Sequence, residues 1–363
     1  MFDLELTDEQ QLVRDTVASF AQNEIRPAAR EADESGSIPQ SIVDQAFDLG
    51  LIHSALPEKH GGYGEVRSAI TGCIVTEELA WGDAAIAMHL LTPRLVAYPV
   101  LDGGTDAQRD LFLPRFTEAF HAATAAVVEP RFDFDAGSFA TTARRENGSY
   151  VLDGHKCFVP LAEESDVLLV LAQEGDAPAG FLVEHGAAGL RVLEREKNMG
   201  FKPLQTNEIT LESVKVPADA RLGGDRGFDI SRMVNLGRVG LASLAVGLAR
   251  GAYEFARDYA KERTAFGVPI AQKQAIAFIL AEMAIEIDSS RLLAWEAAAK
   301  LDRGEDATRE AYLAKRYASR AALRIADNAI QVLGGHGYIR DFPVELWFRN
   351  ARGFSSFEGA TIL

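Results

Sequence analysis

Apolar and polar positions follow different rhythms in successive parts of the chain. From Val13 to Ala21 apolar residues recur at helical spacing, and this spacing returns at Ser231. In between, from about Thr124, short apolar runs are separated by Gly, Pro and Asp, as is typical of strands and turns. The pattern predicts an α+β fold that is mainly α, with an N-terminal helical domain (residues 1–123), a central β-barrel-like domain (124–230) and a C-terminal domain of long helices (231–363).

Local signals mark helices in the N-terminal third. Thr7-Asp8-Glu9-Gln10 has the form of a capping box. Pro39 is placed like the first residue of a helix and Gly50 like its stop. The stretch from Ala69 to Leu91 predicts one further helix that is mostly buried.

The middle third carries a strong hairpin signal at Asn147-Gly148, between the polar stretch that ends at Arg144 and Ser149-Tyr150-Val151-Leu152. Further strands are expected at the apolar runs 167–171, 181–183, 190–193 and 209–216. This is the basis for a β domain of about one hundred residues, which is within the normal size range.

The C-terminal third predicts three long helices at about 233–261, 270–303 and 307–333. Side by side they would form an antiparallel bundle. The first is apolar around much of its circumference, which indicates burial on several faces and favours an oligomer.

Composition narrows the class of protein. The 363 residues are 47% hydrophobic, and the formal charge is 37 − 53 = −16. Such a chain repels nucleic acid and anionic membrane surfaces, so no partner of either kind is expected. Cys73 and Cys157 are the only cysteines, which favours a reducing compartment. The start at Met1 has no basic or apolar leader and no apolar run approaches the about 20 residues of a membrane span, so a cytoplasmic protein is expected.

Candidate chemistry concentrates near the end of the chain. Gln331 opens a glycine-dense helix stop containing Gly334 and Gly335, where a backbone can approach a large ligand. No strand precedes it, so it is not a dinucleotide-binding G-x-G-x-x-G motif. Glu358 lies between Phe357 and Gly359, an apolar setting in which a carboxylate can serve as a base. No group of residues has metal-ligand spacing, and no metal is expected.

Several short motifs follow one another along the chain in an order that is characteristic of one protein family. They are Pro57 to Gly64, Glu129-Pro130, Gly137-Ser138, Gly154-His155-Lys156, Arg263-Thr264-Ala265-Phe266-Gly267, Gln331 to Tyr338, Phe348 to Arg352 and Phe357-Glu358-Gly359. Together they resemble the acyl-CoA dehydrogenase family of flavoproteins over essentially the whole chain. The resemblance implies a C-terminal four-helix bundle, FAD as cofactor, an acyl-CoA substrate and an electron-transfer flavoprotein or similar acceptor.

The resemblance also implies roles for individual residues. The wall beside the flavin ring would comprise Val128, Pro130, Phe158, Val159 and Pro160. The ADP half of a neighbouring subunit's FAD would meet Arg263, Phe266, Gln274, Gln331, Gly334 and Gly335. Substrate would contact Ser138 and Arg238, which match the pantetheine arm, and Phe357 and Gly359 beside the base. Cofactor sharing between subunits implies a homo-oligomer, usually a dimer of dimers in the family.

The family reaction removes two hydrogens from an acyl thioester. By resemblance Glu358 takes the α-proton, and FAD accepts the β-hydride at N5. The backbone N–H of Glu358 and a cofactor hydroxyl would stabilise the enolate oxygen, and one such donor is worth about 3–4 kcal/mol. Packing against the acyl chain and the flavin would move the pKa of the base toward neutrality.

Some positions differ from the common family pattern. Val128, Pro160 and Ala360 replace threonines, Phe357 replaces a tyrosine, and 131–135 lengthens a loop. Each lost hydroxyl would weaken flavin binding by about 1 kcal/mol. Two alternatives to a dehydrogenase therefore stay open: a catalytically silent partner subunit of a hetero-oligomer that binds acyl-CoA, and an acyl-CoA oxidase.

Overall fold

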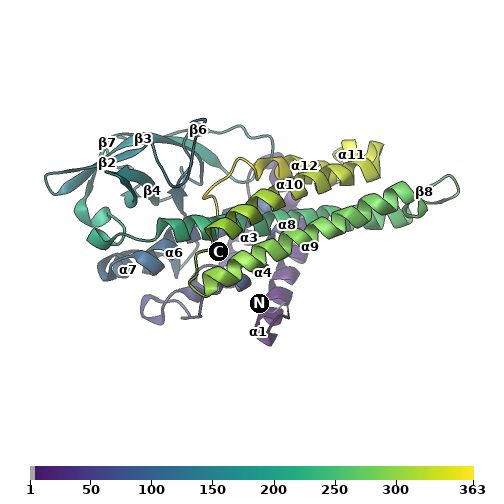
Figure 1. Cartoon of the computed structure of the whole chain (residues 1–363), viewed down its shortest axis with the longest axis horizontal. Helices are drawn as coiled ribbons and strands as arrows, with labels where there is room; N and C mark the ends of the chain where they lie inside the picture. The colour runs from purple at the N-terminus through teal and green to yellow at the C-terminus, as the bar shows by residue number, and fades with distance from the viewer. Residues whose placement is uncertain (1–4) are drawn as a thin grey trace.

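The computed structural model describes residues 5–363. The expectation of no leader concerns the start of the chain, which lies partly outside the described residues. The N-terminal helices are α1 (Asp8–Phe20), α2 (Arg26–Ser35), α3 (Gln40–Asp48), α4 (Ala69–Gly82), α5 (Ala84–Leu91), α6 (Arg94–Gly103) and α7 (Asp106–Phe112). Figure 1 shows a curled sheet at one end of a long helical bundle, with the N-terminal helices α1 and α4 near the middle of the view. The order helical, β, helical is confirmed.

The predicted start of α1 is confirmed. The Thr7 hydroxyl accepts a hydrogen bond from the Gln10 backbone, and the Gln10 side chain accepts one from the Thr7 backbone. The start of α3 differs by one residue, because Pro39 has an extended ψ of 130° and caps the helix rather than opening it. The helix still buries its apolar face through Ile42, Val43 and Ala46.

The single helix predicted from Ala69 to Leu91 is wrong, because the structure has two helices that meet at Asp83. This residue is extended (φ −160°), and its carboxylate accepts hydrogen bonds from the backbone N–H groups of Ala85 and Ile86. An aspartate that caps a new helix competes with continuing the old one.

The central sheet contains β1 (Ala123–Ala126), β2 (Thr142–Glu146), β3 (Ser149–Pro160), β4 (Val167–Glu174), β5 (Ala177–Glu184), β6 (Leu190–Arg195) and β7 (Thr206–Pro217). Its order is β1-β4-β2-β3-β7-β6, with β5 paired to β4. The predicted hairpin is confirmed: Glu146 pairs with Ser149 across Asn147 (φ 50°) and Gly148 (φ 81°). Positive φ at both turn residues is what a tight hairpin turn requires.

The C-terminal bundle consists of α8 (Ile230–Glu262), α9 (Gln274–Asp302), α10 (Thr308–Leu333) and the shorter α12 (Val344–Gly353), with the single-turn α11 (Gly335–Tyr338). A small hairpin of β8 (Thr264–Ala265) and β9 (Val268–Pro269) joins α8 to α9. The several apolar faces of α8 are covered within the chain by α4, α9 and α10. Its burial is therefore not evidence for an oligomer, contrary to the expectation from its sequence.

The last residues of the chain are buried against two helices. A Cβ on Gly72 of α4 would come within 3.0 Å of the Leu363 side chain, and one on Gly240 of α8 within 3.0 Å of Thr361. The absence of side chains at both glycines lets the C-terminal segment lie in contact with α4 and α8. This contact carries the preceding residues, Phe357 to Gly359, into the interior.

No single helix within residues 5–363 combines the length and apolar character needed to cross a membrane. The bent pair α5 and α6, with an angle of 42°, meets the criterion only jointly.

Burial of His89 on α5 makes stability depend on pH. Burial lowers the pKa of His89 from 6.5 to about 4, and its ring stacks on Phe120 at 5.6 Å between centroids. Since the folded pKa is depressed, the unfolded chain binds more protons between these values, and stability falls as pH falls from 6.5 toward 4. At pH 4 this loss amounts to about 3 kcal/mol.

We expect His89→Phe, which keeps the stacking but not the titration, to reduce the loss in unfolding free energy between pH 6.5 and 4 by about that amount. Urea denaturation at both pH values measures it. Equal pH dependence in the two proteins would contradict the assignment, and the comparison cancels other groups such as Asp83, whose pKa burial raises to about 6.

Candidate active site

Glu358 lies in a segment whose backbone is fixed on both sides. Phe357 is 3% exposed, and its ring packs edge-on against Phe158 at 5.8 Å and Phe201 at 5.2 Å. Gly359 has a φ of 62°, and a Cβ there would approach Val127 Cγ2 to 2.5 Å. Only the side chain of Glu358 is therefore able to turn without repacking its neighbours.

The carboxylate of Glu358 is bound by two cations. Arg238 Nε of α8 donates to Oε1 at 3.1 Å, and Lys315 Nζ of α10 donates to Oε2 at 2.8 Å. All three side chains are 14% exposed. The apolar surroundings expected from the sequence are thus wrong for the carboxylate itself, although they hold for the adjacent Phe357.

Sequence reasoning missed Lys315. The sequence did contain a sign of its role, because Lys315 adjoins the small residues that form the buried face of α10, namely Ala311, Ala314 and Ala318. A lysine at the margin of such a face needs an anionic partner when the face packs against its neighbours. That partner lies 43 residues away at Glu358.

The structure brings the predicted flavin wall next to Glu358. The Cys157 backbone N–H donates to the Val128 carbonyl at 2.9 Å, which joins the end of β1 to β3. Phe158 has a positive φ of 52°, unusual for a phenylalanine, and its N–H donates to Glu196 at 3.1 Å. Val159 and Pro160 are buried, whereas Pro130 is exposed.

A buried ion pair supports this wall, and sequence reasoning gave it no role. Lys156 is fully buried and donates to Glu129 at 3.0 Å and to the Val127 carbonyl at 3.1 Å. Glu129 also accepts from the backbone N–H groups of Ala140 and Thr141 at 2.7 and 2.8 Å. The pair therefore ties the end of β1, strand β3 and the loop before β2 into one unit.

Burial lowers the pKa of Lys156 to about 8, although Glu129 opposes this shift. Burial acts to raise the pKa of Glu129, but Lys156 and the two backbone donors outweigh it and hold that pKa below its ordinary value. The carboxylate therefore stays charged at neutral pH.

The predicted substrate residues differ in their surroundings. Arg238 is bonded to Glu358, whereas Ser138 lies exposed in the lengthened loop, where its carbonyl accepts from Arg131. No hydrogen bond joins Ser138 to Arg238 in the part of the chain that the structure describes. The exposed ring of Phe132 lies in the same loop.

The residues predicted for a neighbouring subunit's cofactor gather at the far end of the bundle. Figure 1 shows β8 and α11 at the same end, away from the C-terminus. The exposed residues there are Arg263, Phe266, Gln274, Gln331, Gly334 and Gly335. A Cβ on either Gly334 or Gly335 would meet nothing within 4 Å, so the backbone there is open to a ligand.

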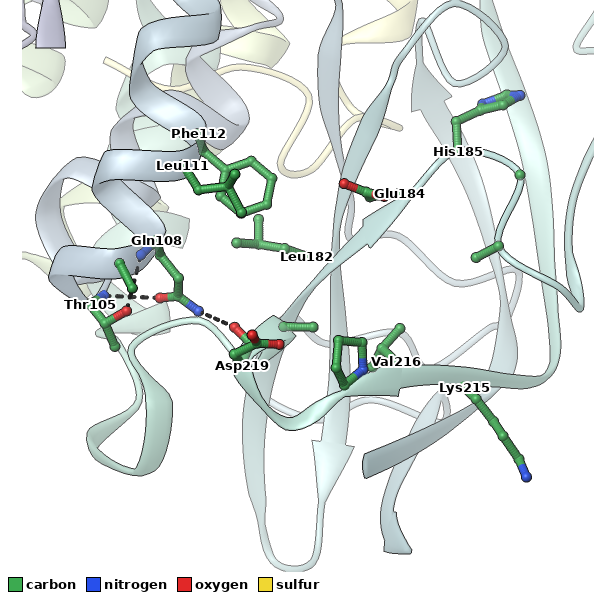
Figure 2. A pocket seen from close by; sticks show the side chains of 15 residues that line it. Thr105, Gln108, Leu111, Phe112, Leu182, Glu184, His185, Lys215, Val216 and Asp219 are labelled. Atoms are coloured by element: carbon green, nitrogen blue, oxygen red, sulfur yellow. Dashed lines mark hydrogen bonds between the residues drawn. The ribbon is translucent and has the colours of Figure 1, made fainter. Parts of the chain in front are cut away.

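A pocket of about 520 Å³ lies elsewhere, between α7 and the ends of β5 and β7. In Figure 2 Leu111, Phe112 and Leu182 line one part, and Gln108 reaches toward Asp219. The Gln108 amide donates to the Asp219 and Arg221 carbonyls at 2.7 and 2.8 Å. The pocket contains none of the predicted site residues, and its visible polar contacts connect the helical and β parts.

Comparison with known proteins identifies the arrangement. Models of the N-terminal, middle and C-terminal domains of acyl-CoA dehydrogenase match residues 7–119, 124–214 and 225–361. The chain belongs to the acyl-CoA dehydrogenase family. Members of this family are FAD-dependent oxidoreductases, and this chain is accordingly an FAD-dependent enzyme that dehydrogenates acyl-CoA.

Individual relatives cover nearly the full chain. An acyl-CoA dehydrogenase of Bacillus subtilis is 34% identical, with 98% of this chain and 96% of the relative covered. The caffeyl-CoA reductase-Etf complex subunit CarC of Acetobacterium woodii is 33% identical, with coverages of 98% and 96%. The solved structure of butyryl-CoA dehydrogenase from Megasphaera elsdenii has a TM-score of 0.89 and 33% identity, with coverages of 99% and 96%.

The residues present fit an FAD of this family. The wall at Val128 and Phe158 is a closely bonded apolar surface, which suits a flat ring system. At the other end, the exposed guanidinium of Arg263 suits a pyrophosphate, and the open backbone at Gly334 permits close approach. Pro160 lacks an N–H and a hydroxyl, so contacts at that position are limited to its carbonyl and ring.

Breaking the buried Lys156–Glu129 ion pair behind the wall should lower the stability of the protein. Lys156→Met removes the fully buried partner of Glu129 and leaves it only Arg131, whose Nε lies 3.1 Å from the other carboxylate oxygen. We expect a loss of about 1.5–3 kcal/mol in unfolding free energy, the range for a hydrogen bond to a charged group. The double variant Lys156→Met with Glu129→Leu should regain part of it, because both buried charges are then gone. Urea denaturation gives these values, and a loss below about 1 kcal/mol for the single variant would contradict the assigned role.

Proposed function

We propose that Glu358 is the base of this acyl-CoA dehydrogenase and that electrons leave to a separate protein carrier. The observation that supports the base is its location. The carboxylate sits on a fixed backbone between Phe357 and Gly359, with Phe357 packed on Phe158 of the proposed flavin wall. A carboxylate held beside the wall is within reach of a thioester lying along it.

In this proposal Glu358 removes the α-proton of the acyl thioester. The α-C–H bond breaks, its electron pair moves toward the thioester carbonyl, and the proton passes to a carboxylate oxygen of Glu358. The backbone N–H of Glu358 is the proposed donor to that carbonyl oxygen, which acquires negative charge. FAD, when bound, supplies the acceptor for the β-hydride.

The other site residues are proposed to bind either the flavin or the substrate. Val128, Pro130, Phe158, Val159 and Pro160 form the proposed flavin wall, and Ser138, Arg238, Phe357 and Gly359 contact the substrate. Exposure of Arg263, Phe266, Gln274 and Gln331 at the far end of the bundle supports their proposed role toward the FAD of a second subunit. A protein carrier is proposed because the related CarC subunit is named as part of a complex with Etf.

The proposed setting is a cytoplasmic enzyme of fatty acid metabolism. The proposed domains are residues 1–123, 124–230 and 231–363. The change from strand to long helix between β7 and α8 and the start of the sheet at β1 support these divisions.

Replacement of the base tests the central claim. We expect Glu358→Gln to slow bleaching of the flavin by an acyl-CoA by about 10²–10⁴-fold, since the proton acceptor is lost. Stopped-flow absorbance under anaerobic conditions measures the rate. Glu305→Gln, a change in the exposed turn after α9, serves as control and should keep the wild-type rate.

Three outcomes would redirect the proposal. Fast bleaching in Glu358→Gln would remove the base assignment. A wild-type protein that purifies without flavin would favour the silent partner subunit. Rapid peroxide formation under air without an added acceptor would favour an oxidase.

A homo-oligomer, proposed as a dimer of dimers, is supported by an exposed stripe on α9. Phe278, Ile285 and Leu292 recur every seven residues and are 59%, 65% and 44% exposed. A heptad spacing of apolar residues is the pattern of a helix that packs on another helix.

We expect Ile285→Asp to lower the molecular mass measured by light scattering on size exclusion, because a charge would be buried in the contact. The subunits should also lose flavin if the cofactor is shared. Thr16→Asp on the exposed side of α1 is the matched control. An unchanged mass in Ile285→Asp would place the contact elsewhere.

A further inference from the structure

The carboxylate of Glu358 has both of its oxygens engaged. Oε1 accepts from Arg238 and Oε2 accepts from Lys315, at 3.1 and 2.8 Å. Charge-assisted bonds of this kind are among the stronger hydrogen bonds in proteins. Each carboxylate oxygen has two lone-pair sites, and these bonds occupy one on each oxygen and fix the direction in which the others point. We call this arrangement closed, because the carboxylate cannot turn an oxygen toward a substrate carbon while both cations hold it.

The two cations differ in how firmly they are held. The Arg238 guanidinium lies 5.7 Å from the centre of the Tyr312 ring, one turn before Lys315 on α10. Lys315 reaches Glu358 through a flexible four-carbon stem, and Glu358 is its ion-pair partner within residues 5–363. A lysine ammonium is also more strongly hydrated than a guanidinium, so it separates from a carboxylate more readily.

Release of Lys315 leaves the charge of Glu358 compensated. The three groups carry two positive charges and one negative charge, so Arg238 alone balances the carboxylate once Lys315 has moved. The backbone on both sides of Glu358 is fixed by Phe357 and Gly359. The transition from closed to open therefore needs rotation of side chains only.

We propose that Lys315 is a positioning residue that holds the Glu358 carboxylate closed, and that an acyl-CoA ligand must break the Lys315–Glu358 ion pair as it binds. This rests on the proposed role of Glu358 as base. Only the fraction of protein molecules in the open arrangement can bind acyl-CoA, so the ion pair lowers the apparent affinity in proportion to that fraction. Its purpose in the reaction is to keep the base engaged when the site holds no ligand.

Binding of a CoA thioether tests this, since a thioether has no acidified α-proton and reports binding without turnover. With the flavin-loaded protein in a titration calorimeter, we expect Lys315→Met to bind about two- to fivefold more tightly than wild type, the range for a partly exposed ion pair. Lys315→Arg should bind as wild type does. In steady-state assays with an acyl-CoA, Lys315→Met should lower KM with little change in kcat.

A double-mutant cycle separates the ion pair from other effects. In the Glu358→Gln background, where the carboxylate is absent, Lys315→Met should give no further gain in thioether affinity. Equal gains in both backgrounds, or an affinity in Lys315→Met that is unchanged or weaker, would overturn the proposal. Lys315→Gln replaces Lys315→Met if thermal melting shows that the latter does not fold.

The outcomes for the two proposals are distinguishable. Fast flavin bleaching in Glu358→Gln removes the base assignment whatever Lys315 does. Slow bleaching in Glu358→Gln together with wild-type thioether affinity in Lys315→Met retains the base and removes only the closing role of Lys315.

Discussion

The approach of the C-terminal segment to α4, α8 and β1 is the constraint on which the site depends. It depends most on Gly359, where an added Cβ would come within 2.5 Å of Val127, and it is eased at Gly72 and Gly240, where an added Cβ would come to 3.0 Å from Leu363 and Thr361. Close packing of this kind tolerates little change, since protein interiors have few voids and deform only at a cost in free energy. The segment brings Glu358 to the junction of the sheet and the bundle, although it follows α12 in the sequence.

Two groups of charged side chains near this junction differ in how firmly they are held. The Glu129–Lys156 pair is buried and bonded to three backbone segments, so it holds β1 and β3 together. The group around Glu358 is partly exposed, and its lysine has a long flexible stem. The first arrangement suits a rigid wall, and the second suits a side chain that has to move.

Much of the fold could be predicted because its signals are local. The capping box at Thr7, the turn at Asn147-Gly148 and the helical period after Ser231 each depend on residues close in sequence. Predictions failed where a local signal had two outcomes. Asp83 could continue a helix or cap a new one, and the apolar circumference of α8 could face a second subunit or other helices of the same chain.

The candidate site shows the same limit. Its residue types and order were sufficient to indicate the family, because several motifs occur together along the whole chain. They did not indicate that Glu358 would lie between Arg238 and Lys315, which are 120 and 43 residues away from it. The sequence by itself determined the elements, their order and the glutamate that carries the proposed chemistry. Only the tertiary structure decided the charges around that glutamate, since which side chains meet depends on how the helices pack and not on their spacing in the chain.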